Sequence, residues 1–363
     1  MELTGEGIWL WMQRRSLPRT RRFADEICRT LGFSVCGTEA IYQASMGLSL
    51  DDAYWVPPAG STIAFEDVTP YMNHFSDALA NVALYGTSDL HIDSCMTPEL
   101  TTDGTLRKAW AIDGNGKRCL RKGRTFGYNP GEPTSEAIAS ALADLTKMNH
   151  VRYRYEEISG EPFCTCSNFT DPEHSYVPYA AADGHRRLAD VLAIAWLFGH
   201  VQLEQLRNML VFDCLICNSD RHFVNFGFLR DNGTGELMGL APVFDNGRGL
   251  FPRASEASIE WMNRESLVST PAFGGLSFEK LCSTVMGPVQ AGMLETIAKG
   301  IDDVSLPKSI SRRAESLAPF LKRRAQNLAN RPIADQAQFA EAVEEHAYKL
   351  TGCAQHEWQP RHA

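Results

Sequence analysis

The segment 218–247 limits the possible folds most strongly, because it places polar side chains on both sides of one predicted β-hairpin. Asp220 and Asn225 precede the hairpin, and Asp245 follows it. The predicted turn, AspAsnGlyThrGly at 231–235, contains residue types that tolerate the positive φ angles of tight turns. A hairpin brings its two ends together, so we expect these three side chains to lie at one site.

The spacing of these residues is typical of kinases. An Asp followed five residues later by Asn, then a short hairpin and Asp-x-Gly, is the arrangement that supports phosphoryl transfer. There the first Asp accepts the proton of the substrate hydroxyl, and the Asn and the second Asp bind magnesium. Each residue type also has a structural use, since Asp forms turns, Asn caps helices and Asp-Asn-Gly can make a type I′ turn. The joint spacing between apolar strands favours the catalytic interpretation.

The residues around these positions resemble one kinase family. Asn-x-Asp-Arg-His-x-x-Asn at 218–225, followed by a hairpin and Pro-x-Phe-Asp at 242–245, resembles the HipA-like serine/threonine kinases of bacterial toxin–antitoxin systems. The loop is also similar to the D-R-H-x-x-N of phosphoinositide 3-kinase relatives. The resemblance covers roughly 98–285 and implies an ATP- and Mg²⁺-dependent protein kinase with a bilobal, protein-kinase-like fold.

The resemblance also implies which residues of the segment act. Asp220 would be the catalytic base, and Asn225 and Asp245 would be the magnesium ligands. Three further candidate catalytic residues match the family's loop: Asn218, Arg221 and His222. Arg221 and His222 would brace the loop or approach phosphate. The structural alternative for Asn218 is that its side chain only makes hydrogen bonds within the loop.

The first half of the chain contains two more residues that a kinase needs. Lys122 ends the second strand of a predicted hairpin and is positioned to reach nucleotide phosphates. Glu136, on the following helix, is positioned to be its ion-pair partner. Lys117 is a weaker candidate than Lys122 for the lysine that binds phosphate, because it lies in the turn. A lone Lys and a lone helical Glu are usually surface residues, so the nucleotide-binding interpretation depends on the catalytic loop.

A short loop before the first hairpin is the last candidate part of the nucleotide-binding site. ProGluLeuThrThrAspGly at 98–104 resembles the family's loop that covers the phosphates. Its backbone N–H groups could bind phosphate, as nests of amides do. An ordinary Asp-Gly turn is the alternative. The candidate cofactor-binding residues of this loop are Thr101, Thr102, Asp103 and Gly104.

Periodicity predicts an α+β protein with a β-rich N-lobe and a mostly helical C-lobe that contains the catalytic hairpin. Before the loop we expect a hairpin around Asp113–Gly116, a helix over 133–148, and strands over 151–155 and 163–169, the last placed like a hinge between lobes. Further helices are expected at 23–31, 185–198, 202–214, 278–299, 308–330 and 333–348. The predicted divisions are an N-terminal extension with the start of the N-lobe (1–95), the N-lobe (96–172), the C-lobe (173–350) and a tail (351–363).

Composition argues against several other classes of protein. The net charge of −9 makes direct nucleic-acid binding by the whole surface unlikely, although six arginines in the first 30 residues keep a polyanionic or protein partner open. The most apolar run, 191–199, is too short to span a membrane. The first residues lack the charge order of a secretory signal, so we expect a cytoplasmic protein whose ten cysteines are reduced.

The partners follow only from the resemblance. HipA-type toxins contact a DNA-binding antitoxin, which implies an antitoxin-like protein partner here besides ATP and an unidentified protein substrate. Two alternatives remain open: a catalytically silent regulator or scaffold with a kinase fold, and a small-molecule or lipid kinase. We prefer an active protein kinase because a silent relative would be expected to lose at least one of Lys122, Asp220, Asn225 and Asp245.

Overall fold

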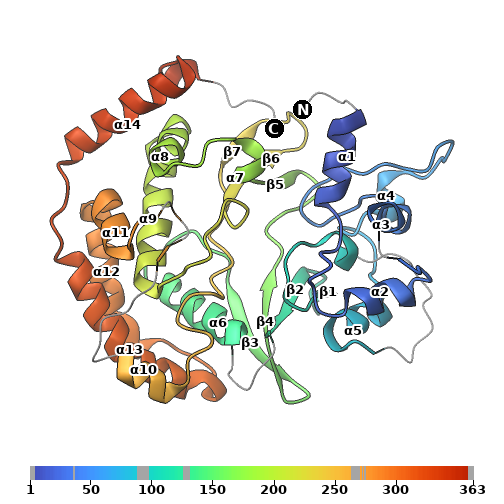
Figure 1. The fold of residues 1–363 in the computed structure, drawn as a ribbon, viewed down its shortest axis with the longest axis horizontal. Helices are drawn as coiled ribbons and strands as arrows, with labels where there is room; N and C mark the ends of the chain where they lie inside the picture. Colours follow the sequence, from blue (N-terminus) through green and yellow to red (C-terminus); the bar gives the residue numbers. More distant parts are fainter. Residues whose placement is uncertain are drawn as a thin grey trace.

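A computed structural model describes residues 5–35, 37–87, 98–125, 131–262, 270–271, 273 and 275–358. Figure 1 shows two halves on either side of central strands. One half contains the N-terminal helices and the first hairpin, and the other contains the C-terminal helices. The predicted division between residues 95 and 96 lies outside the described residues.

The N-lobe is built on a four-stranded antiparallel sheet with strand order β1-β2-β4-β3. Its strands are β1 (Lys108–Ile112), β2 (Arg118–Gly123), β3 (Tyr153–Ile158) and β4 (Glu161–Ser167). The predicted turn joins β1 to β2, with Gly116 N donating to Asp113 O at 2.9 Å. The resulting register places Lys108 directly opposite Lys122. Helix α6 (Gly131–Asp144) packs on the sheet through β3 and β4.

The first 85 residues are more helical than the sequence indicates. Besides the predicted α2 (Ala24–Thr30), they form α1 (Gly5–Arg14), α3 (Thr38–Ser45), α4 (Phe65–Val68) and α5 (Asp77–Tyr85). Buried residues of α2 and α5 share one apolar cluster with Ala109 of β1 and Phe163 of β4. Helices α2 and α5 therefore cover one face of the N-lobe sheet. A short 3-10 helix, η1 (Pro98–Thr101), precedes β1.

A second, three-stranded sheet carries the predicted catalytic hairpin. Its strands are β5 (His174–Pro178), β6 (Gly227–Asp231) and β7 (Leu237–Leu240), in the order β5-β6-β7. The hairpin of β6 and β7 agrees with the sequence prediction, whereas β5 was not expected. Beyond β7, Val243 forms an isolated parallel bridge with His150. This bridge holds the segment that leads to Asp245 against the connection between α6 and β3.

The C-lobe is helical. Its elements are α7 (Tyr179–Ala182), α8 (Leu188–Leu197), α9 (His200–Ile216), α10 (Glu256–Met262), α11 (Phe278–Val285), α12 (Pro288–Gly300), η2 (Ile301–Asp303), α13 (Lys308–Ala329), α14 (Gln336–Thr351) and η3 (Gln355–Glu357). The single helix predicted over 278–299 is wrong, because the chain is extended at Met286 and a second helix starts at Pro288. A proline suits the first turn of a helix but not its interior.

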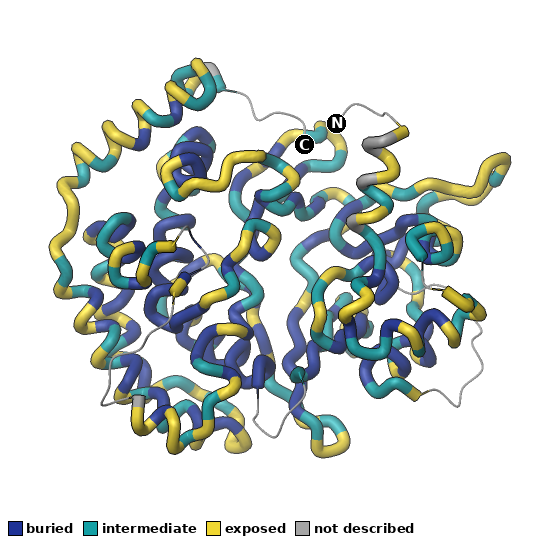
Figure 2. Tube along the Cα trace, viewed as in Figure 1, coloured by how far each residue is buried: buried dark blue, intermediate teal, exposed yellow. Residues whose placement is uncertain are grey.

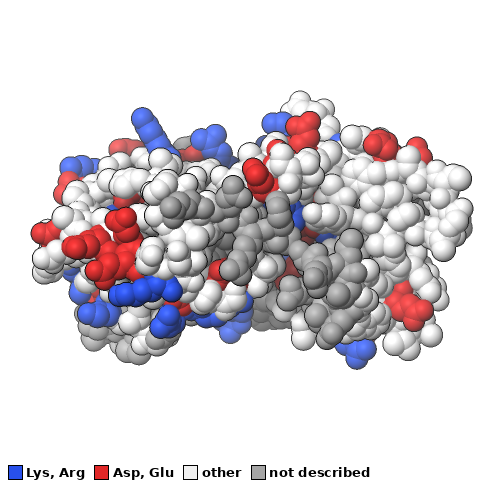
Figure 3. Space-filling model, turned by 90° about the horizontal axis from the view of Figure 1, so that it is seen from above, with Lys and Arg blue, Asp and Glu red and all other residues white. Residues whose placement is uncertain are grey.

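The largest apolar core lies between α6, α8, α9 and the helices after residue 278. Figure 2 shows α6, α8 and α9 largely buried, whereas α14 contributes few buried residues and is mostly exposed. On the face drawn in Figure 3, the described acidic and basic side chains are interspersed. None of the described helices combines the length and apolar character needed to cross a membrane. Seven described cysteines are free, but Cys28 is disulfide-bonded, so the expectation of reduced thiols is wrong at that position.

Candidate active site

The loop that follows α9 is fixed by buried hydrogen bonds. The helix ends at Ile216 and is followed by Cys217, whose φ of 55° is left-handed. The fully buried Asn218 donates from Nδ2 to Asp213 Oδ1 at 3.0 Å and accepts the backbone N–H of Asp220 at 3.1 Å. Asn218 therefore connects the last turn of α9 to the loop and has the hydrogen-bonded position expected of a structural loop residue.

Arg221 joins the loop to the segment beyond the hairpin. Its guanidinium binds both carboxylate oxygens of Asp213, at 2.9 and 3.1 Å, and donates to Asn225 O at 2.8 Å. It also donates to Phe244 O and, at 2.6 Å, to Asn246 Oδ1. Burial opposes the charged form of Arg221, but the charge and hydrogen bonds of Asp213, together with the charges of Asp245 and Glu136, raise its pKa above the usual value. Arg221 is thus positioned to brace the loop, and its donors are directed to protein groups.

Asp220, His222 and Asn225 differ in exposure. The Asp220 side chain is 43% exposed, and its Oδ2 lies 3.9 Å from Arg248 Nε. Asn225 is buried, and its Nδ2 donates to Asp220 O at 2.9 Å, which leaves Oδ1 as the amide atom for a metal. The exposed His222 accepts the backbone N–H of Val224 at 3.4 Å. The loop thus presents a carboxylate to solvent and an oriented amide beside it.

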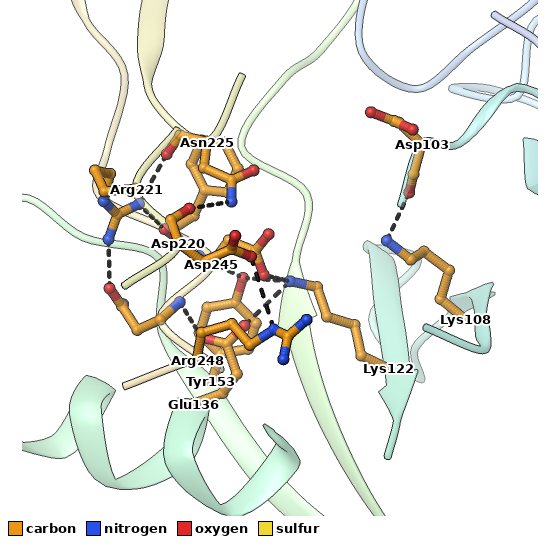
Figure 4. A network of polar contacts seen from close by, with 12 residues as sticks. Asp103, Lys108, Lys122, Glu136, Tyr153, Asp220, Arg221, Asn225, Asp245 and Arg248 are labelled. Atoms are coloured by element: carbon orange, nitrogen blue, oxygen red, sulfur yellow. Dashed lines mark hydrogen bonds and ion pairs between the residues drawn. The ribbon is translucent and has the colours of Figure 1, made fainter. Parts of the chain in front are cut away.

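Lys122 connects the two lobes. Its buried ammonium donates to Glu136 Oε1 of α6 at 3.1 Å, to Asp245 Oδ1 at 2.9 Å and to the hydroxyl of Tyr153 at 3.2 Å. The second Glu136 oxygen accepts the backbone N–H of Asn246 at 2.8 Å. Figure 4 shows Lys122 reaching from β2 toward the group formed by Asp220, Asn225 and Asp245. The predicted Lys122–Glu136 ion pair is therefore present, and it extends to Asp245.

Two carboxylates share this one lysine, and they ionise differently. Burial opposes the charged form of Lys122, but Asp245, Tyr153 and Glu136 raise its pKa well above the usual value. Burial raises the pKa of Glu136 to about 7, against the effect of Lys122. Burial also acts on Asp245, but Lys122 and Lys108 hold its pKa far below the usual range. At neutral pH Asp245 is therefore the permanently ionised carboxylate of the pair.

Asp245 also has an unusual backbone conformation. Its φ is 57°, in the left-handed region where residues other than glycine are uncommon. The hydroxyl of Tyr153 accepts its backbone N–H at 3.4 Å, and Lys122 binds its side chain. Such conformations persist where surrounding contacts hold them, and they are concentrated at functional sites. The structure therefore fixes both the backbone and the carboxylate of Asp245.

A second lysine, Lys108, lies in the same region. It is 9% exposed, and its ammonium donates to Asp103 O at 2.6 Å (Figure 4). Burial, together with the charges of Arg21 and Lys122, lowers the pKa of Lys108 to about 7. A Cβ on Gly104, whose φ is +96°, would come within 2.5 Å of this ammonium. Gly104 therefore leaves the space that the Lys108 side chain occupies.

The loop 98–104 is held mainly by Arg21. This buried guanidinium donates to Glu99 O and Gly104 O, each at 3.0 Å, and to Thr102 O. The Thr101 hydroxyl donates to Leu48 O at 2.6 Å and the Thr102 hydroxyl to Pro98 O at 2.7 Å. The Asp103 carboxylate accepts the Gly104 N–H at 2.6 Å. These side chains stabilise the loop, so contact with a phosphate would fall mainly to its backbone.

Sequence reasoning missed Lys108 and Arg21. The register of the predicted hairpin could have identified Lys108, because a turn at Asp113–Gly116 places residue 108 opposite Lys122. The role of Arg21 had no comparable signal, because its contacts lie about 80 residues further along the chain. At least one of the N-terminal arginines thus has an internal structural role and is not part of a free basic surface.

The two lobes, with the β6–β7 hairpin in the helical one, form a kinase-like fold. The chain is similar to the Helicobacter pylori proinflammatory kinase CtkA, with a TM-score of 0.52 and 17% identity over 69% of this chain and 94% of that one. It is also similar to HipA in the Shewanella oneidensis MR-1 toxin–antitoxin complex of HipA, HipB and operator DNA. That match has a TM-score of 0.50 and 15% identity over 88% of this chain and 85% of the other. The sequence matches no protein-family model and no curated protein. The predicted fold class is therefore confirmed.

Proposed function

We propose that the chain is an ATP- and Mg²⁺-dependent kinase that transfers the γ-phosphoryl group to Ser or Thr hydroxyls of a protein. The observation that carries this proposal is the buried network in which Lys122 joins Glu136 of α6 to Asp245. Kinases need a strand lysine, its helical glutamate and a metal-binding aspartate to be in place together. The kinase-like fold is consistent with this use of the network.

The donor atoms of the site fit magnesium. Asn225 Oδ1 and the ionised Asp245 carboxylate are hard oxygen ligands, which is what Mg²⁺ prefers. Asn225 and Asp245 would hold the metal, which would supply positive charge to offset the negative charge that develops during transfer. Lys122, and Lys108 in its protonated form, would bind phosphate oxygens and add positive charge on the N-lobe side. Binding would require the Lys122 ammonium to share its contacts between Asp245 and the nucleotide.

Asp220 would act as the general base. Its carboxylate is more accessible than those of Glu136 and Asp245, so an incoming hydroxyl can reach it. It would accept the hydroxyl proton as the oxygen attacks phosphorus. Asn218 and Arg221 would keep the loop in position without touching the reacting atoms. His222 remains a candidate for contact with a substrate on the exposed side of the loop.

The protein substrate and partner are further parts of the proposal. The HipA structure contains HipB and operator DNA, which supports an antitoxin-like protein partner for this chain. The net charge of −9 favours a protein partner over direct contact with nucleic acid. Co-purification of the tagged chain with a protein encoded beside it would support this, and retention on DNA without any partner would contradict it.

Calorimetric titration with ATP, with and without Mg²⁺, tests the proposed site. We expect binding that Mg²⁺ strengthens at least tenfold in the wild type and not in Asp245→Asn. Asp303→Asn, an exposed substitution of the same type in η2, should behave like the wild type. A folded wild-type protein without affinity for ATP would favour a silent scaffold. Equal Mg²⁺ dependence in Asp245→Asn would refute the assignment of the metal ligand.

A further inference from the structure

A pocket lies outside the proposed active site. Its volume is about 590 Å³, and it is formed where the α6–β3 connection meets the end of β4 and the start of the segment that leads to Asp245. We call it the α6–β3 pocket and define it by Asp144, Lys147, His150, Arg152, Phe169 and Pro242. It includes none of the proposed catalytic, metal-binding or nucleotide-binding residues. Its volume is in the range of pockets that bind small molecules.

His150 and Asp144 lie side by side in this pocket. The His150 side chain is only 5% exposed, and its Nδ1 lies 2.8 Å from Met148 O. A carbonyl only accepts hydrogen bonds, so Nδ1 carries a proton and donates it to Met148 O. Nε2 makes no hydrogen bond within the described part of the chain and lies 3.7 Å from Asp144 Oδ1. Nε2 itself is buried, whereas the Asp144 side chain is 41% exposed, so the carboxylate is the acceptor that the donor of a ligand can reach.

The rim of the pocket is basic. Lys147 and Arg152 are both exposed, and Arg152 Nε binds Asp144 Oδ1 at 2.8 Å. With one carboxylate and two cations, these side chains leave a net positive charge. Phe169 and Pro242 contribute an apolar wall. The pocket therefore offers cations at its rim, acceptors beside them and an apolar surface.

We propose that the α6–β3 pocket binds a small organic anion that also carries hydroxyl or amino donors. The phosphate or carboxylate of such a ligand would contact Lys147 and Arg152. Its hydroxyl or amino group would donate to Asp144, and its carbon skeleton would pack on Phe169 and Pro242. Sugar phosphates and amino acids share this combination of groups.

Backbone hydrogen bonds connect the pocket to the proposed active site. Val151 N donates to Val243 O at 2.8 Å, and Val243 N donates to Asn149 O at 2.9 Å. Val243 stands two residues before Asp245, and Phe244 between them packs against Phe169 with ring centroids 5.5 Å apart. A ligand that shifts residues 149–151 or Phe169 would therefore act on the position of Asp245. This coupling rests on the proposed function, whereas ligand binding itself does not.

Calorimetry with four probes tests the binding site. Ribose 5-phosphate and glutamate each combine an anion with donors, inorganic phosphate is the anion alone and ribose provides hydroxyls alone. We expect at least one of the first two to bind ~10-fold more tightly than both controls, and which one binds distinguishes a sugar phosphate from an amino acid. Absence of binding by both, or equal binding by inorganic phosphate, would overturn the proposed ligand class.

Substitutions at the rim locate the binding. Lys147→Asn with Arg152→Gln should weaken the bound probe at least about tenfold, because charge-assisted hydrogen bonds are lost. Asn suits the left-handed φ of 58° at residue 147. Arg154→Gln is the matched control, because Arg154 is exposed on β3 and does not line the pocket. Equal weakening in both proteins, or none in the double variant, would place the probe elsewhere.

A separate titration measures the coupling. Saturating probe should change the affinity for ATP with Mg²⁺ by about fivefold or more in the wild type and leave it unchanged in the double variant. An unchanged affinity in the wild type would overturn the coupling. If the protein binds no ATP, the proposed function fails, while the probe titrations still decide whether the pocket binds its ligand.

Discussion

Raising the pH from about 6 to about 8 should weaken nucleotide binding through Lys108. Burial and the neighbouring cations Arg21 and Lys122 lower the pKa of this ammonium to about 7. Its charged fraction then falls from about 0.9 to about 0.1 over this range, and apparent affinity falls with the fraction of competent protein. If phosphate requires the charged form, the dissociation constant for ATP with Mg²⁺ should rise about tenfold.

Calorimetry at several pH values, compared with Lys108→Met, isolates this effect. The nucleotide itself and Glu136, whose pKa is raised to about 7, titrate in the same range in both proteins. At each pH, the ratio of the dissociation constants of Lys108→Met and the wild type for ATP with Mg²⁺ therefore cancels the contribution of the nucleotide and of Glu136. Lys117→Met, in the exposed turn of the same hairpin, should retain the wild-type profile. Parallel profiles for the wild type and Lys108→Met would refute the role of Lys108 in binding phosphate.

Two further substitutions test the residues that hold the catalytic loop, Lys122 and Asp245 in position. Arg221→Lys should lower the free energy of unfolding by ~2–4 kcal/mol, because a lysine cannot serve Asp213 and the carbonyls of Asn225 and Phe244 together. Urea unfolding measures this, and a loss below ~0.5 kcal/mol would contradict it. Tyr153→Phe removes the hydroxyl that accepts from Lys122 and from the backbone of Asp245, so affinity for ATP with Mg²⁺ should fall about five- to tenfold. Unchanged affinity on calorimetric titration would show that Tyr153 does not position them.

The parts of the fold that were predicted correctly have local signals. The Asp113–Gly116 and 231–235 turns mark both hairpins, and the α6 helix follows from its apolar spacing. The break before Pro288 and the strand β5 were missed. The periodic apolar residues on both sides of Pro288 concealed the break, and a short strand between a hinge and a helix has little pattern of its own.

The residues of the candidate site also divide into those with a local sequence signal and those without one. Asp220, Asn225 and Asp245 could be selected because a hairpin fixes their spacing, and Lys122 because a strand lysine was sought. The α6–β3 pocket and the contacts of Arg21 could not be found this way. They depend on how β4, α6 and the N-terminal helices pack, which involves residues far apart in the sequence.

Transfer of labelled γ-phosphate from ATP to the chain itself and to dephosphorylated casein tests the central claim most directly. We expect Mg²⁺-dependent labelling of Ser or Thr by the wild type and at least a 100-fold loss in Asp220→Ala, with affinity for ATP and Mg²⁺ changed less than about threefold. Asp220 is exposed and lies outside the core, so its substitution should leave the fold intact. Labelling that persists in Asp220→Ala would contradict its role as the base, and absence of labelling by a wild type that binds ATP would contradict the proposed activity.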